Sequence, residues 1–185
     1  VCAVSYKNRI GEGYPPGHRT KIASYACTAD YHTTIKGMLN GMLEHLKAAD
    51  PGLGGRAFVD TAPLLEKQLA VEAGLGWIGR QSLLVTPKVI DTGRCISCHT
   101  IEREPSGGID LDGWIFGCDR CQSCCPHNQK APMHANRAFD PVFDPLTMDA
   151  AAWMALDETE FEARMGATPL TRSGLARIRG NIKTE

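Results

Sequence analysis

The sequence contains no long apolar run, almost no net charge and few aromatic side chains. Its 185 residues carry 20 basic and 21 acidic side chains, a net charge of −1, and only 6% are aromatic. A membrane-spanning helix needs about 18 or more consecutive apolar residues, so we expect no membrane partner. Balanced charge argues against generic polyanion binding by the whole chain, although it leaves room for a local basic patch. The few aromatics suggest no stacking platform for single-stranded RNA.

The eight cysteines are unevenly distributed along the chain. Six lie between Cys95 and Cys125, and the other two are Cys2 and Cys27. A secreted disulfide scaffold spreads its cysteines through a short chain, whereas one compact group behind a globular stretch is typical of metal ligation in a reducing compartment. We therefore expect a cytoplasmic protein that binds a metal.

Apolar periodicity and turn residues predict a mixture of strands and helices. The expected elements are strands at 1–6, 56–60 and 82–86 and helices at 30–49, 63–74 and 148–156. The second helix is expected to open at Pro63, because proline is tolerated in a first turn. The order of elements indicates an α+β domain followed by a cysteine-built metal subdomain.

Two metal sites fit the cysteine spacing, and the first is zinc. Cys95 and Cys98 form one Cys-x2-Cys pair, and Cys118 and Cys121 form another after a spacer of nineteen residues. Structural zinc sites use two such pairs, each presented by a reverse turn.

The second fit is an iron–sulfur cluster. Cys118, Cys121 and Cys125, with Pro126 directly after, match the end of a ferredoxin run, in which the last cysteine ligates a different cluster from its neighbours. Cys124 adds a further thiolate. Both metals need soft thiolate donors held by turns, so spacing alone leaves both open.

Several separated segments resemble, in the same order, the motifs of one known family. These segments are Tyr25-Ala26-x3-Asp30-Tyr31-His32, Phe58-Val59-Asp60-Thr61-Ala62-Pro63 with Glu66, Ala73-Gly74-Leu75-Gly76-Trp77-Ile78-Gly79, the cysteine segments from Cys95 and from Cys118, and Thr171-Arg172-x-Gly174 with Arg179-x-Asn181. The family is epoxyqueuosine reductase, a cobalamin- and iron–sulfur-dependent enzyme of tRNA queuosine synthesis. The resemblance covers nearly the whole chain.

The resemblance implies a cobalamin-binding-type sheet-and-helix domain at 1–87, a ferredoxin-like iron–sulfur subdomain at 88–135 and a helical segment with a basic tail at 136–185. It also implies a reaction, the reduction of epoxyqueuosine to queuosine in tRNA, the last step of queuosine biosynthesis. Electrons from an external donor would pass through a 4Fe-4S cluster to cobalamin. A nearby acid would protonate the leaving oxygen, because expelling an unprotonated alkoxide is unfavourable.

Asp60 matches the proton donor of the family. It follows a predicted strand and precedes a predicted helix, a place from which side chains project into clefts. The alternative is that Asp60 or Thr61 only caps the helix.

The resemblance also implies a cofactor pocket and a tRNA contact. The pocket residues are Tyr25, Cys27, Asp30, Tyr31, His32, Arg80 and Gln81, the last two standing where the family usually has Lys-Asn. The tRNA contacts are Arg172, Arg177 and Arg179, since guanidinium groups pair well with phosphate oxygens. A solvated basic tail is the alternative for these arginines.

The sequence departs from the family between Thr86 and Cys95, where a further segment with four cysteines is absent. Cys95, Cys118 and Cys121 would then hold one cluster with a fourth thiolate, which Cys98 or Cys124 could supply in place of the absent cysteine. The same departure strengthens the zinc alternative. Two other functions therefore stay open: a non-catalytic tRNA-binding module stabilised by zinc or a cluster, and a corrinoid reductase acting on another electrophile.

Overall fold

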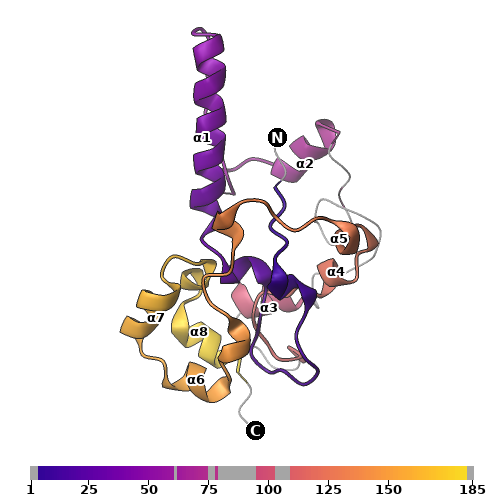
Figure 1. Cartoon of the computed structure of the whole chain (residues 1–185), viewed down its shortest axis with the longest axis vertical. Coiled ribbons are helices and arrows are strands. Elements are labelled where there is room, and N and C mark those ends of the chain that lie inside the picture. Colours follow the sequence, from indigo (N-terminus) through magenta and orange to yellow (C-terminus); the bar gives the residue numbers. More distant parts are fainter. Residues whose placement is uncertain (1–3, 61, 75–77, 79–94, 103–108, 183–185) are drawn as a thin grey trace.

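A computed structural model of the chain describes residues 4–60, 62–74, 78, 95–102 and 109–182 (Figure 1). The helices are α1 (Tyr31–Ala49), α2 (Glu66–Glu72), α3 (Ile96–Ile101), α4 (Arg120–Ser123), α5 (Pro126–Lys130), α6 (Ala150–Ala155), α7 (Glu158–Met165) and α8 (Gly174–Gly180). The strands are β1 (Lys21–Ile22) and β2 (Trp114–Phe116). Short 3-10 turns lie at Arg9–Glu12, Ser24–Cys27, Arg137–Phe139, Pro145–Thr147 and Pro169–Arg172. The fold is thus helix-rich with a small sheet.

The two described strands form a parallel pair although they are far apart in the sequence. Lys21 pairs with Trp114 and Ile22 with Phe116, with an irregularity between the two pairs. Gly113 permits this approach, because its φ is +76° and a Cβ there would lie 2.6 Å from the carbonyl oxygen of His18. The sheet therefore joins the N-terminal region to the segment just before Cys118.

One hydrophobic core gathers residues from both ends of the chain. Its buried members include Ile22, Cys27, Ile115, Phe116, Met148, Trp153, Phe161, Met165, Leu170, Leu175 and Ile178. Asn181 fastens the C-terminal helix to this core, since its side-chain amide donates 2.9 Å bonds to the carbonyl oxygens of Thr100 and Ile115. The expected boundaries after residues 87 and 135 stay predictions, and the core contains residues from both sides of them.

The first long helix agrees with its prediction. Asp30 caps α1 by accepting a bond from the backbone N–H of His32, a role that short carboxylates fill well. None of the residues of α1 is buried, and Figure 1 shows the helix extending away from the body that α3, α6, α7 and α8 form. Its N-terminal turn, in contrast, lies against the body. The site described below starts at that turn.

Other predicted elements differ from the structure. Residues 4–6 and 56–60, expected as strands, are extended or bent without a strand partner among the described residues, and a lone strand leaves its backbone groups without a ladder. The second helix begins at Glu66 rather than Pro63. The strand expected at 82–86 lies outside the described residues. The short helix predicted near 148–156 is confirmed as α6. In the described part of the chain, no helix is long and apolar enough to cross a membrane.

Candidate active site

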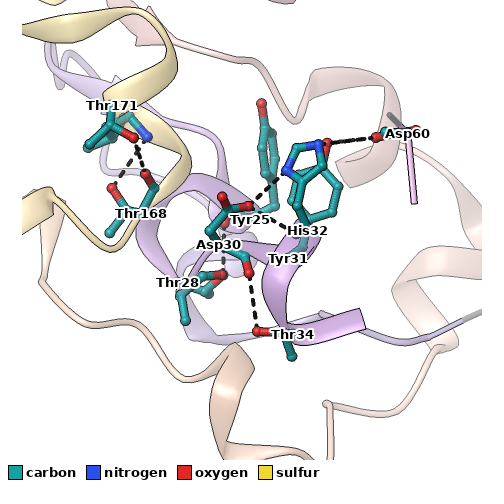
Figure 2. A network of polar contacts seen from close by, with 11 residues as sticks. Tyr25, Thr28, Asp30, Tyr31, His32, Thr34, Asp60, Thr168 and Thr171 are labelled. Carbon is teal, nitrogen blue, oxygen red and sulfur yellow. Dashed lines mark hydrogen bonds and ion pairs between the residues drawn. The ribbon is translucent and has the colours of Figure 1, made fainter. Parts of the chain in front are cut away.

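A polar network begins at the first turn of α1 (Figure 2). The carboxylate of Asp30 caps the helix and also lies 2.8 Å from Nδ1 of His32. The His32 ring stacks on the ring of Tyr31, with centroids 4.1 Å apart and planes 26° from parallel. One short acidic residue therefore sets both the start of the helix and the orientation of the imidazole.

Asp60 meets this network from a different part of the chain. The hydroxyl of Tyr31 donates a 2.7 Å hydrogen bond to Oδ2 of Asp60, and Nε2 of His32 lies 4.0 Å from the same oxygen. Burial and the bond to Asp60 raise the pKa of Tyr31 well above its usual value. Tyr31 is therefore a neutral hydrogen-bond donor near neutral pH.

The backbone of Asp60 is unusual as well. Its φ is +51°, in the left-handed region that residues other than glycine seldom adopt. Its N–H donates a 2.9 Å bond to Oε1 of Glu66, the first residue of α2. The side chain is 55% exposed, so the carboxylate faces solvent although Tyr31 bonds it and Glu66 bonds the backbone of the same residue.

Tyr25 connects the network to the core. Its ring meets Tyr31 edge-on at 6.0 Å and Phe116 at 6.5 Å. Burial raises the pKa of Tyr25, and the charge of Asp119 adds to the effect. The structure thus brings together five residues that the sequence predicted for the pocket and the acid: Tyr25, Asp30, Tyr31, His32 and Asp60. Arg80 and Gln81 lie outside the described residues.

Cys27 has a different environment from the one expected. Its side chain is fully buried in the hydrophobic core, with the thiol 3.8 Å from the carbonyl oxygen of Ala23. Burial strongly raises the pKa of this thiol. A residue inside the core has no open face for a cofactor, so the pocket role of Cys27 stays a prediction without structural support.

The residues around Asp60 suit a corrin cofactor chemically. A phenol, an imidazole and two carboxylates, from Tyr31, His32, Asp30 and Asp60, are hydrogen-bond partners for the amide side chains around a corrin ring. The side chain of Asp60 is 55% exposed, so its carboxylate can be reached from solvent. The donor set therefore fits cobalamin.

The cysteines that remain from the two-cluster pattern are neighbours. Cys95 caps α3, Cys118 follows β2, and Cys121 lies in α4. Both Cys95 and Cys118 interact electrostatically with Cys121, whose pKa burial raises. Burial also raises the pKa of Cys118, to about 11. These half-buried thiols are soft donors of the kind that iron–sulfur clusters and zinc require.

The thiols do not form a complete ligand set. Among the described residues, no group of three His, Cys, Asp or Glu side chains is placed to hold a metal ion. Cys98 lies within α3, Cys124 is exposed after α4, and Cys125 precedes α5. The described residues therefore supply soft donor atoms, but no three of them surround one metal position.

A separate cavity lies beside the cysteine segment. Its volume is about 480 Å³, and its lining includes Tyr6, Lys7, Asp119, Gln122 and Asn128. None of the residues that hold Asp60 lines it. The cavity and the Asp60 network are thus different features of the molecule.

The three arginines predicted to contact tRNA have different environments. Arg172 is exposed, forms an ion pair with Glu102, and is close enough to Tyr25 and Tyr31 for its charge to offset part of the burial-driven rise in the pKa of both phenols. Arg177 donates to the carbonyl oxygen of Thr100 at 3.4 Å. Of the three arginines, Arg172 alone combines an exposed side chain with a place beside the Asp60 network.

Arg179 points inward to backbone groups instead. Its Nε donates a 3.1 Å bond to the carbonyl oxygen of Trp153, and Nη2 donates to that of Leu156. These are the last carbonyls around α6, which lack partners within the helix. Arg179 therefore stabilises the fold, and its tRNA contact stays a prediction.

Sequence reasoning missed two roles. Glu66 is part of a motif in the sequence, but its bond to the Asp60 backbone was not expected. Asp119 is a buried carboxylate that accepts a 2.6 Å bond from the backbone N–H of Ser24, and burial raises its pKa. Its position beside Cys118 was visible, whereas its partner lies 95 residues away and gave no local signal.

Comparison with known proteins places the chain in a family. Residues 1–61, which contain the whole network from Tyr25 to Asp60, match the family model described as "Epoxyqueuosine reductase QueG, DUF1730". The epoxyqueuosine reductase of Cellulophaga algicola is 31% identical, with 88% of this chain and 69% of that protein covered. The alignment extends over 211 positions, more than the 185 residues of this chain, so the relative contains internal positions that the chain lacks.

Solved structures show the same fold. A selenomethionine-labelled epoxyqueuosine reductase superposes with a TM-score of 0.75 at 20% identity. Two others give a TM-score of 0.73: one, at 20% identity, with an epoxyqueuosine-modified tRNA-Tyr stem loop, and one from Bacillus subtilis, at 18% identity, with a catalytic aspartate loop swung out of the active site. Each match covers 97% of this chain and 61% of the solved chain, so this chain spans about three fifths of their length. On the sequence relationship and the shared fold, the chain belongs to the epoxyqueuosine reductase family.

Proposed function

We propose that the chain reduces epoxyqueuosine to queuosine in tRNA, with Asp60 as the proton donor. The observation that carries the proposal is the carboxyl group of Asp60, exposed at a left-handed turn and fixed by Tyr31. A tRNA stem loop with this modification is bound in a structure of the same fold, and a catalytic aspartate loop is described in another. A tRNA substrate also agrees with a cytoplasmic location.

The chemistry explains why an acid is needed at this place. Removing the epoxide oxygen breaks two C–O bonds, forms a C=C bond and releases water, which takes two electrons and two protons. Protonating the oxygen as the first C–O bond breaks avoids a free alkoxide and is worth roughly 10²- to 10⁴-fold in rate. Asp60 would hold this proton on its carboxyl group, with Tyr31 fixing the direction of the group.

The electrons require cofactors, which the family resemblance implies. Cobalamin, when bound, supplies a reducing cobalt centre at the substrate. Tyr25, Asp30, Tyr31 and His32 would orient it against Asp60, and Arg80 and Gln81 are further proposed contacts. An external electron donor would act through one cluster at the cysteine segment.

The ligands of that cluster would come from the cysteine segment described above. Cys95, Cys118 and Cys121 would hold it with Cys98 or Cys124, and Cys125 lies beside them.

The tRNA contact is assigned to Arg172. Its guanidinium is exposed and lies close to Tyr25 and Tyr31, so a phosphate bound there would place the anticodon loop beside the network. Glu102, its partner in the ion pair, would release it to the phosphate. A bidentate contact of this type positions RNA without reading its sequence.

Turnover by an Asp60→Asn variant tests the assignment. The protein is purified without oxygen, loaded with cobalamin and given tRNA that carries epoxyqueuosine, and the nucleosides are quantified by mass spectrometry. We expect Asp60→Asn to lose at least about 100-fold in turnover with an unchanged circular dichroism spectrum. Asp50→Asn, at the exposed C-terminal end of α1, is the matched control and should keep wild-type turnover. An active Asp60→Asn variant would overturn the role of this residue.

A zinc-stabilised tRNA-binding module is the second candidate. The two Cys-x2-Cys pairs at Cys95/Cys98 and Cys118/Cys121 favour it, together with the internal positions that the Cellulophaga algicola protein has and this chain lacks. Iron, sulfide, zinc and cobalt content of the anaerobically purified protein separates the two. Iron with sulfide and bound cobalamin supports the reductase, and zinc without a corrin supports the module.

A further inference from the structure

We infer that Glu66 is a positioning residue that holds the Asp60 turn in the conformation in which Tyr31 bonds its carboxylate. The inference rests on the proposed role of Asp60 as proton donor. Glu66 does not touch the carboxyl group of Asp60: its Oε1 accepts the backbone N–H of Asp60 at 2.9 Å, six residues away. Glu66 therefore acts on the acid only through the backbone that carries it.

The backbone of Asp60 needs such a partner. Its φ of +51° is unfavourable for a residue with a Cβ, and strained conformations of this kind persist where the surroundings fix them. A bond to the N–H of the strained residue itself opposes rotation of its peptide group. Since Glu66 is the first residue of α2, the helix serves as the anchor of the turn.

Two attachments thus hold Asp60, and they act on different atoms. Tyr31 holds the carboxylate from α1, and Glu66 holds the peptide N–H from α2. The side chain is 55% exposed, so little packing restrains it. If the bond to Glu66 is lost, the contacts of the carboxylate with Tyr31 and His32 are left to oppose a rotation of the turn. A swung-out catalytic aspartate loop is recorded in the Bacillus subtilis structure of the same fold, which shows that a second conformation is accessible there.

Glu66 has an alternative role that an experiment must separate from positioning. A carboxylate in the first turn of a helix is stabilised by the helix dipole, so Glu66 could serve α2 alone. That role depends on charge, whereas the bond to Asp60 depends on an acceptor oxygen. Gln keeps the oxygen and loses the charge, and Ala loses both. Glu72, at the last turn of the same helix, provides a matched control.

The test measures hydrogen exchange of the Asp60 amide by NMR, together with kcat and KM on epoxyqueuosine-containing tRNA. We expect Glu66→Ala to speed Asp60 exchange and to lower kcat by about three- to tenfold, the range of one net hydrogen bond, with KM unchanged. Glu66→Gln should restore both values, and Glu72→Ala should leave both at wild type. Should Glu66→Ala unfold, Glu66→Met, which keeps the length and helix propensity without an acceptor, takes its place.

Two outcomes overturn the inference. One is unchanged Asp60 exchange in Glu66→Ala, and the other is a Gln variant as impaired as the Ala variant, which would assign the effect to charge. If the wild-type protein itself has no turnover, the proposed function fails separately. The exchange of the Asp60 amide then still decides whether Glu66 holds the turn.

Discussion

The hydroxyl of Tyr31 donates a 2.7 Å hydrogen bond to the carboxylate of Asp60, although 29 residues separate the two in the sequence. Tyr31 starts α1, and Asp60 forms a left-handed turn ahead of α2. The bond therefore connects two elements that otherwise share little of the core. Because the side chain is exposed, this bond and the one to Glu66 fix where the proposed proton donor would present its proton.

Replacing Tyr31 by Phe removes the donor and keeps the ring that stacks on His32. We expect kcat to fall by about three- to tenfold, because the carboxyl group of Asp60 loses one net hydrogen bond, while the fold and tRNA affinity stay unchanged. Single-turnover kinetics with a filter-binding control measures this. Wild-type kcat in Tyr31→Phe would show that the bond has no part in turnover.

Substitution of Arg172 should weaken tRNA binding, whereas substitution of Arg179 should lower the stability of the fold. Arg172→Ala is expected to weaken tRNA binding and to reduce the slope of log affinity against log salt by about 1, as loss of one phosphate contact does. Arg179→Ala leaves the carbonyls of Trp153 and Leu156 without their donor and should lower the free energy of unfolding by about 1–3 kcal/mol. Binding titrations at several salt concentrations and urea unfolding provide the two readouts. A loss of stability in Arg172→Ala and a loss of tRNA binding in Arg179→Ala would contradict both roles.

The thiols should react with iodoacetamide in an order set by burial. In metal-free protein at pH 8, exposed Cys124 should be labelled before Cys118, and Cys27 last. Burial raises the pKa of Cys118 to about 11. Its reactive thiolate is therefore scarce at pH 8 and increases as the pH rises towards 11, so its labelling should accelerate over that interval. Peptide mass spectrometry follows the labelling of each cysteine. Equal labelling rates for Cys118 and Cys124 at pH 8 would contradict the greater burial of Cys118.

Two glycines should respond to alanine in opposite directions. Gly113→Ala puts a Cβ 2.6 Å from the His18 carbonyl at a φ of +76°, so we expect a loss of about 1–3 kcal/mol in the free energy of unfolding. Gly37 lies inside α1, and no atom comes within 4 Å of the place that an added methyl group would take. Gly37→Ala should therefore gain about 0.5–1 kcal/mol. Urea unfolding of both variants checks the pair, and a neutral Gly113→Ala would show that the strand contact can relax.

The sequence predicted what depends on near neighbours. Apolar spacing located α1, and the motif residues Tyr25, Tyr31, His32 and Asp60, taken from the family resemblance, meet in one network. The helix follows from a short-range pattern, whereas the meeting of Tyr31 with Asp60, 29 residues away, was expected from the family resemblance.

Long-range contacts were not predictable in the same way. The strand expected at 56–60 has suitable residues but no partner in the described structure, while the two-residue strand β1 was missed because its partner is Trp114 to Phe116. Cys27 was expected in the pocket because it lies between pocket residues in the sequence, yet its side chain turns into the core. Which face of a short turn is buried depends on segments that meet it only in the folded chain.

The parallel pairing of β1 with β2 has a consequence for biosynthesis. Lys21 emerges from the ribosome long before Trp114, and at typical elongation rates the delay is on the order of ten seconds. During that time Ile22, Ala26 and Cys27 lack the later members of the core, among them Ile115, Phe116 and Met148. The nascent N-terminal region is thus a part of the chain that chaperones and proteases can bind before β2 is made. Mutations in β2 should therefore reduce the yield in the cell more than they reduce the stability of the purified protein.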